Sequence, residues 1–155
     1  MKNSKVLLFV LLIFGFLFSM NQVLISHCQV PCGIYDDSMR FKMIAEHITT
    51  IEKAMNQILE LSKSSPVNYN QIIRWVTNKE THAEELSHIL SYYFLAQRIK
   101  PVSSENEKVY KRYLEQLEII HHLTVFTMKA KQTTDLSIIK KLRDLLTAFE
   151  NLYTM

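Results

Sequence analysis

The sequence has 155 residues, a formal net charge of +3, two glycines, three prolines and two cysteines. Residues 1–26 hold two lysines and no acidic residue, so the rest of the chain carries a charge of about +1, which argues against nucleic acid as a partner. The scarcity of glycine and proline predicts long helices, and the residues after position 26 are enough for one domain with its own core.

Residues 1–26 are predicted to be a cleavable leader. Lys2 and Lys5 precede an almost unbroken apolar run, which is the layout of a secretory signal peptide. The run is shorter than the about 20 apolar residues that a membrane span needs. We expect cleavage between Ser26 and His27, with export to the periplasm or the medium. The alternatives are a propeptide removed in the cytoplasm and an uncleaved anchor.

Residues 27–35 read His-Cys-Gln-Val-Pro-Cys-Gly-Ile-Tyr and hold both cysteines of the chain. Cleavage before His27 would bring together a free α-amine, the imidazole, and the amide and thiolate of Cys28. Cys32 adds a second thiolate, and Gly33 permits a turn with positive φ. This donor set is nearly complete for one metal ion.

Four segments with apolar residues at alternating spacings of three and four predict four helices. In the first, over 37–62, the stripe is Ile44, Ile48, Ile51, Met55 and Ile58. In the second, over 69–98, it is Ile72, Val76, Ala83, Leu86, Leu90 and Tyr93.

The third helix is predicted to start at a capping box of Ser104 and Glu107 and to run to about residue 129. Its expected stripe is Tyr110, Leu114, Leu117, Ile120, Thr124 and Val125. The fourth follows a cap at 133–135 and carries Ile138, Leu142, Leu145, Phe149 and Leu152. We therefore expect an all-α antiparallel four-helix bundle over 37–153, in a domain spanning 27–155.

The donor set at 27–35 suits nickel or copper, because these ions favour planar nitrogen and sulfur surroundings. The amine, the amide and the thiolate of the first two residues form adjacent small chelate rings, and Cys32 supplies the fourth donor. The His27 imidazole can approach as an axial ligand. Anionic amide and thiolate donors favour a higher oxidation state of the metal, so the site suits one-electron cycling with a small species such as superoxide.

This segment resembles, without a gap, the HCxxPCGxY nickel hook of the nickel-containing superoxide dismutases. Weaker similarity continues through Asp36 and through 75–82 and 93–101. The resemblance implies an enzyme that converts superoxide to dioxygen and hydrogen peroxide by Ni(III)/Ni(II) cycling. It also implies a four-helix bundle, assembly as a homohexamer, and a peptidase that exposes the amine of His27.

The resemblance implies nickel ligands at His27, Cys28 and Cys32. Tyr35 matches the tyrosine that follows the hook and lines the approach of the small anion. Tyr93 matches a second tyrosine near the metal, with Tyr92 as the competing choice. Three residues are candidates for orienting the axial imidazole: Glu46, Arg74 and His82.

Other interpretations use the same residues. Cys28 and Cys32 could form a disulfide in an oxidising compartment, in a non-catalytic exported bundle whose N-terminal loop is redox-active or sequesters a metal. Two Glu-x-x-His pairs have the spacing of di-iron bundles, namely Glu85 with His88 and Glu118 with His121. We expect Glu85 and Glu118 to reach solvent instead. The simplest expectation for the remaining polar residues is a surface or helix-boundary position for His47, His82 and His122, and a solvated face for Lys79, Glu80, Glu84 and Glu85.

Overall fold

A computed structural model of the chain describes residues 33–154, so the leader and the expected nickel ligands His27, Cys28 and Cys32 lie outside the described residues. Its elements are α2 (Asp37–Ser62), α3 (Tyr69–His88), η1 (Ile89–Arg98), α4 (Glu107–Gln132) and α5 (Ser137–Thr154). Between residues 33 and 154 there is no strand. The prediction of an all-α four-helix bundle is confirmed, since η1 continues directly from α3.

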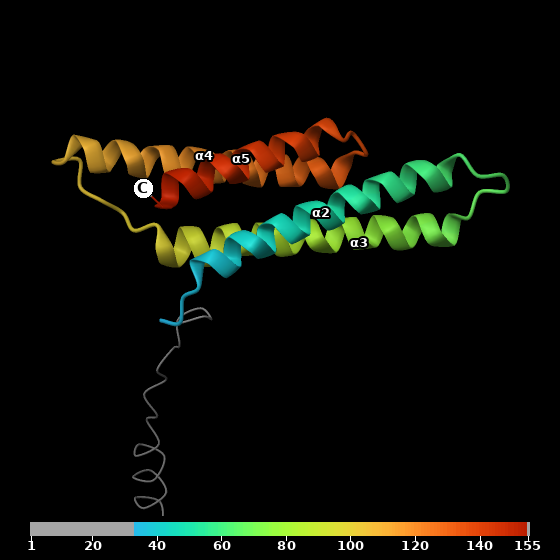
Figure 1. Cartoon of the computed structure of the whole chain (residues 1–155), viewed down its shortest axis with the longest axis horizontal. Helices are drawn as coiled ribbons and strands as arrows, with labels where there is room; N and C mark the ends of the chain where they lie inside the picture. Colours follow the sequence, from blue (N-terminus) through green and yellow to red (C-terminus); the bar gives the residue numbers. More distant parts are fainter. Residues whose placement is uncertain (1–32, 155) are drawn as a thin grey trace, which may run out of the picture. The chain divides into compact units, whose positions relative to one another are not determined.

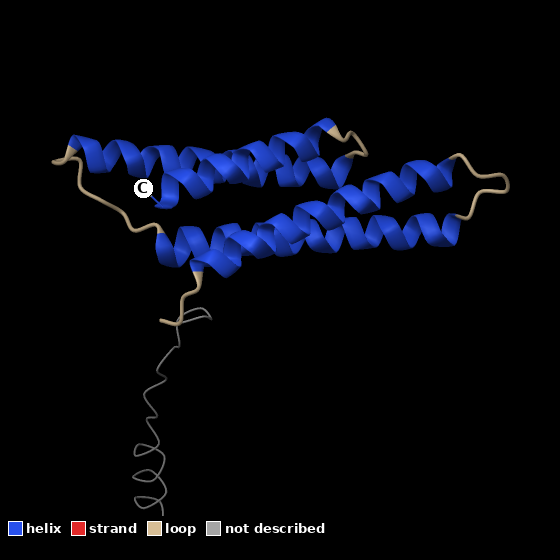
Figure 2. Cartoon of the chain, viewed as in Figure 1, coloured by secondary structure: helices blue, strands red, loops and turns tan. Residues whose placement is uncertain are grey.

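The helices form two antiparallel pairs, α2 with α3 and α4 with α5 (Figure 1). Because α2 also contacts α5 and α3 contacts α4, the four helices surround one core. Figure 2 shows that loops join successive helices at alternating ends of the bundle. Across residues 33–154, no helix has an apolar stretch long enough to cross a membrane.

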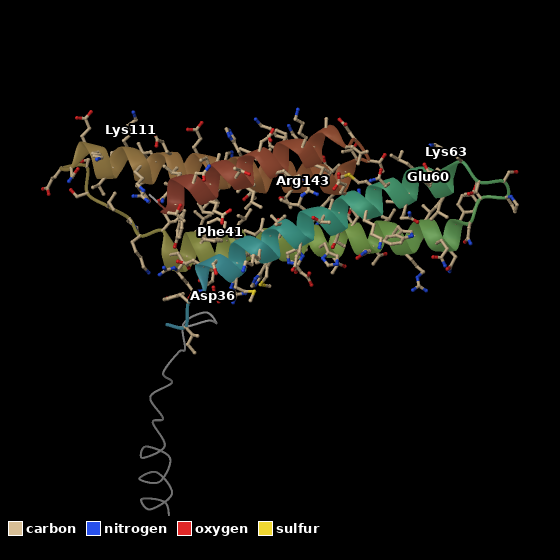
Figure 3. All side chains as sticks on the ribbon, in the orientation of Figure 1. Asp36, Phe41, Glu60, Lys63, Lys111 and Arg143 are labelled. Atoms are coloured by element: carbon tan, nitrogen blue, oxygen red, sulfur yellow. The ribbon has the colours of Figure 1, made fainter. Side chains whose placement is uncertain are left out.

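The predicted apolar stripe of α2 is buried along its whole length, from Ile44 to Ile58. At one end of the bundle four aromatic rings pack on one another, with neighbouring centroids 5.0 to 5.8 Å apart. They are Phe41, Phe94, Phe149 and Tyr153. Figure 3 labels Phe41 between the helix pairs, whereas Lys63 and Lys111 lie on the outside. Burial of several large rings makes this end a principal part of the core.

Each of the first three helices begins at a side chain that accepts a hydrogen bond from the backbone. Asp36 accepts from the Met39 amide in α2, and Asn68 caps α3 in the same way. The predicted capping box at Ser104 is wrong, because Asn106 Oδ1 accepts from the Val109 amide and α4 starts two residues later. Asparagine ranks with serine as an N-cap residue, so Asn106 can start the helix in place of Ser104.

The buried face of α3 differs from the predicted one at two positions. Val76 is 38% exposed, whereas Lys79, expected on a solvated face, is only 4% exposed. The Lys79 ammonium donates to the carbonyls of Ala130 at 3.0 Å, Lys131 at 2.5 Å and Thr133 at 3.0 Å. Carbonyls at a helix C-terminus lack partners within their own helix, so a buried lysine from α3 satisfies those of α4.

The buried face of α4 is also rotated relative to the predicted one. Leu114 is exposed, and Tyr110 and Leu117 are only partly buried. The fully buried positions of α4 are Ile120, Leu123, Thr127 and Ala130. Two of these four residues, Thr127 and Ala130, are small. A prediction based on hydrophobicity alone therefore does not place them on the buried face.

Candidate active site

Tyr35 and Tyr93, the two tyrosines predicted for the site, are neighbours in the fold. Their ring centroids are 5.9 Å apart in an edge-to-face arrangement. Tyr35 lies just before α2, and Tyr93 lies in η1 with only 3% of its surface exposed. Gly33, two residues before Tyr35, has φ of 74°, so the predicted turn with positive φ is confirmed.

Asp37, in the first turn of α2, joins Tyr93 to two further side chains. Its Oδ1 accepts hydrogen bonds from the Tyr93 hydroxyl at 2.5 Å and from Arg98 Nε at 2.8 Å. Its Oδ2 accepts from Arg98 Nη2 at 2.5 Å and from the Tyr153 hydroxyl at 2.9 Å. We call these four residues the Asp37 cluster; it connects α2, η1 and α5.

The Asp37 cluster shifts the pKa values of its members in opposite directions. Burial alone would raise the pKa of Asp37, but the hydrogen bonds from Arg98, Tyr93 and Tyr153 outweigh it and lower the pKa below its ordinary value. Burial, together with the bond to Asp37, raises the pKa of Tyr93 to about 12. At neutral pH Asp37 is therefore an anion and the Tyr93 hydroxyl is a fixed donor.

Two guanidinium groups flank the tyrosine pair. The Arg98 guanidinium carbon lies 4.4 Å from the Tyr35 ring centroid, and that of Arg40 lies 4.9 Å from the Tyr93 centroid. These distances are within the range of cation–π contacts. Arg98 is neutralised by Asp37, whereas Arg40 makes no carboxylate pair among the described residues. Arg40 thus leaves a positive charge beside the two rings.

The π-helical winding of η1 explains how two of its residues reach one carboxylate. Gln97 Nε2 donates to the Tyr92 carbonyl, and the Ile99 amide donates to the Phe94 carbonyl five residues earlier. In an α-helix, residues five apart point about 140° away from each other. A π-helical turn brings such residues onto one face, so Tyr93 and Arg98 both contact Asp37.

The competing choice, Tyr92, lies elsewhere. Its side chain is 43% exposed and its ring stacks on that of His88 at a centroid distance of 4.3 Å. It takes no part in the Asp37 cluster. The geometry therefore favours Tyr93 as the partner of Tyr35.

No hydrogen bond or ion pair joins the three candidates for orienting an imidazole among the described residues. Glu46 is exposed, and Arg74 lines a separate surface depression with Trp75. His82 instead faces His47, with 2.9 Å between their Nδ1 atoms. His47 lies in the middle of α2 with a side chain only 12% exposed, so the expectation of a surface or helix-boundary position was wrong for this residue.

Burial lowers the pKa of His47, the carboxylate of Glu85 raises it, and His82 lowers it further. A net lowering favours the neutral imidazole, so the contact between the rings is a single N–H···N bond. Near it, a groove of about 450 Å³ runs along the seam of α2 and α3. Its lining includes Arg40, Met43, His47, Glu85 and His88.

The di-iron interpretation does not fit the structure. Glu85, His88, Glu118 and His121 are all exposed on α3 and α4, as expected for the two glutamates. A di-iron site needs inward-facing carboxylates in the bundle core. The two Glu-x-x-His pairs therefore reflect helical spacing on solvated faces.

These observations define a four-helix-bundle protein with a histidine–cysteine segment ahead of α2 and a tyrosine pair where α2 begins. The family model described as nickel-containing superoxide dismutase matches residues 22–155, and the chain belongs to that family. It is accordingly an oxidoreductase that contains nickel and acts on superoxide. No curated protein and no solved structure gives a significant match to the chain.

Sequence reasoning missed Asp37, Arg98 and Tyr153. Each comes from a different helical element, and no spacing in the sequence links them. The one available signal was a second aspartate after Asp36, since a helix needs only one acidic cap. Its partners become evident only when the bundle is assembled.

Proposed function

We propose that the enzyme binds nickel through the hook at residues 27–35 after cleavage between Ser26 and His27. The ligands are the amine and imidazole of His27, the amide and thiolate of Cys28, and the thiolate of Cys32. The observation that carries this assignment is the complete hook signature within the matched range, residues 22–155. Thiolate and amide nitrogen donors also fit the preference of nickel for planar nitrogen and sulfur surroundings.

When bound, nickel supplies one-electron chemistry, alternating between Ni(III) and Ni(II) as superoxide is converted to dioxygen and hydrogen peroxide. The protein contributes geometry and access. Tyr35 follows Cys32 by three residues, a length of chain that spans at most about 11 Å. We assign Tyr35 and Tyr93 to the approach of the small anion and to the holding of water or peroxide.

The described residues support this role in two ways. The Tyr93 hydroxyl is fixed by Asp37, and the Tyr35 ring is held between Tyr93 and Arg98. The guanidinium of Arg40, which has no carboxylate partner in the described part of the chain, supplies a positive charge next to the pair. A positive charge of this kind attracts a small anion such as superoxide.

The remaining features of the proposal concern processing and assembly. The leader at 1–26 directs export to the periplasm or the medium, with removal in the cytoplasm as the alternative, and a peptidase makes the cut before His27. The mature chains assemble as a homohexamer. Exposed apolar side chains on the bundle, including Ile73, Val76, Leu114 and Met128, supply surface for such an assembly.

The test is to purify the protein from its source and measure its N-terminal sequence, nickel content and superoxide dismutation together. We expect a chain beginning at His27, one nickel per chain, and activity that disappears when nickel is removed. An active protein that keeps residues before His27, or that contains no nickel, contradicts the proposed hook.

The tyrosines are tested in the same assay by Tyr35→Phe and Tyr93→Phe, with Tyr92→Phe as the matched control. We expect lower activity for the first two at unchanged nickel content, and no change for the control. Equal activity in all three variants would exclude the proposed role of the pair.

A further inference from the structure

His47, His82 and Glu85 direct three donor atoms toward one point on the seam between α2 and α3. The Nδ1 atoms of the two histidines are 2.9 Å apart. Glu85 Oε2 lies 3.5 Å from Nδ1 of His47 and 3.5 Å from Nδ1 of His82. All three atoms fall within 4.8 Å of one another. The cluster uses neither the hook nor the Asp37 cluster.

The separations match those of donors around one small divalent ion. With metal–nitrogen and metal–oxygen distances of about 2.0–2.2 Å, donors in a tetrahedral site lie roughly 3.3–3.5 Å apart. Both contacts of Glu85 already have this separation. The imidazole pair needs to open by only a few tenths of an ångström, and the side chains of His82 and Glu85, 30% and 53% exposed, have room to move.

The position also provides a fourth coordination site and a path for the ion. The groove of about 450 Å³ is lined by His47 and Glu85, so water can complete the coordination sphere from that side. Two histidines and a glutamate with one open position form a recurrent zinc ligand set. Imidazole and carboxylate donors without thiolate suit zinc and its neighbours among the divalent transition ions.

We propose that His47, His82 and Glu85 form a second metal site, which binds a divalent transition ion of the zinc class and links α2 to α3. The ion replaces the hydrogen bond between the two imidazoles and adds the Glu85 carboxylate as a third ligand. Because the ligands come from two helices, the site exists only in the folded bundle, and the ion stabilises that state.

The experiment titrates zinc into the untagged full chain carrying Cys28→Ser and Cys32→Ser, which removes the thiolates of the hook. Zinc is measured by competition with a chromophoric chelator and by the shift in melting temperature. We expect one equivalent of tightly bound zinc and a higher melting temperature. Adding His82→Gln should weaken binding by more than tenfold, since even changes outside the ligand shell cost about 10–100-fold at metal sites.

His47→Gln should behave like His82→Gln, and circular dichroism establishes that each variant is folded. The matched control is His122→Gln, which removes an exposed histidine from α4 and should leave zinc affinity unchanged. Zinc binding that persists unweakened in folded His82→Gln, or the absence of an equivalent of zinc in the parent, overturns the proposal. Neither result bears on the nickel hook, whose two thiolate ligands are already removed in this experiment.

Discussion

Asp37 is the acceptor for three side chains, and its charge sets the properties of all of them. Arg98 binds it through two nitrogens, and the hydroxyls of Tyr93 and Tyr153 take the remaining positions. A carboxylate held in this way fixes the orientation of its neighbours more strongly than neutral hydrogen bonds do. The position of Tyr93 beside Tyr35 therefore depends on Asp37, which forms a hydrogen bond with Tyr93 but not with Tyr35.

Replacing Asp37 by Asn should destabilise the bundle by about 1–3 kcal/mol at neutral pH, because a partly buried guanidinium loses its counter-charge. The pKa of Asp37 is lowered in the folded state, so its contribution is complete above the ordinary value of about 3.9 and is lost as the pH falls through the lower folded value. Urea unfolding between pH 2 and 7 measures both effects. The free energy of unfolding of Asp37→Asn should depend less on pH over this range than that of the parent.

Asp144→Asn is the control for this experiment, since Asp144 is exposed on α5. It should change stability by less than about 0.5 kcal/mol at pH 7. If Asp37→Asn were as stable as the control and kept the acid dependence of the parent, the cluster would have no energetic role.

Tyr93→Phe tests how the stability of the fold depends on pH in the alkaline range. The pKa of Tyr93 is raised to about 12, above its ordinary value of about 10, so its contribution to folding is complete below pH 10 and is lost as the pH rises through about 12. Unfolding measured between pH 8 and 12 should show a smaller loss of stability for Tyr93→Phe than for the parent. Tyr92→Phe should follow the parent, and a parent-like slope in Tyr93→Phe would argue against the assigned contact.

At the scale of elements, Lys79 links α3 to the end of α4, a contact that the sequence pattern does not predict. Its ammonium has three donors, and the end of α4 presents three carbonyls. Burial lowers the pKa of Lys79, while the neighbouring Glu80 raises it. Cations also interact favourably with the C-terminal end of a helix dipole. α3 thus supplies the cap that α4 lacks in its own sequence.

Lys79→Met should destabilise the protein by about 2–3 kcal/mol, because it preserves most of the side-chain volume but leaves buried carbonyls without donors. Chemical denaturation gives the value, and amide exchange at the end of α4 should accelerate. Lys63→Met, at an exposed lysine whose one ion pair within residues 33–154 is with Glu60, should change stability by less than about 0.5 kcal/mol. Equal effects of the two substitutions would contradict the capping role.

The positions of the helices in the sequence were largely predictable, whereas the face that each helix buries was less so. Apolar spacing gave the bounds of α2 and its buried stripe, because each stripe residue is strongly hydrophobic. Apolar spacing failed at Val76 and Lys79. Lys79 is buried because the carbonyl groups at the end of α4 need hydrogen-bond donors, and this outweighs its low hydrophobicity. The π-helical segment from Ile89 to Arg98 has no signal in a pattern of threes and fours. The contacts of Tyr93 and Arg98 with Asp37 depend on that segment, so Tyr93 was predicted but its partners were missed.

At the scale of the molecule, the hook motif is recognised from contiguous residues, whereas clusters in the bundle join residues that are far apart in the sequence. The proposed nickel ligands lie within the contiguous residues 27–35, so the sequence alone is enough to propose them. The cluster of His47, His82 and Glu85 joins residues 35 positions apart on two helices. The spacing of these residues in the sequence matches no known metal motif, and all three were expected at surface or helix-boundary positions.

The bundle should fold without nickel, because the core is built from residues of α2 to α5 and η1. Cys28→Ser and Cys32→Ser should each abolish superoxide dismutation while far-UV circular dichroism and the unfolding midpoint stay close to those of the parent. Gln29→Ala, within the same segment but outside the proposed ligand set, should retain activity. Loss of helical content in the cysteine variants would show that the hook is a structural element of the fold.

The bond between Tyr153 and Asp37 joins residues 116 positions apart, at opposite ends of the helical region. Closing a loop of that length costs entropy that one hydrogen bond does not offset, so we expect this bond to form late in folding. Tyr93 and Arg98 reach Asp37 from η1, so docking of α5 adds Tyr153 as the last donor to this carboxylate. A chain arrested before α5 forms would contain Asp37, Tyr93 and Arg98 but would lack the Tyr153 donor. The order of the helices thus leaves the last one to complete the donor set of a carboxylate in α2.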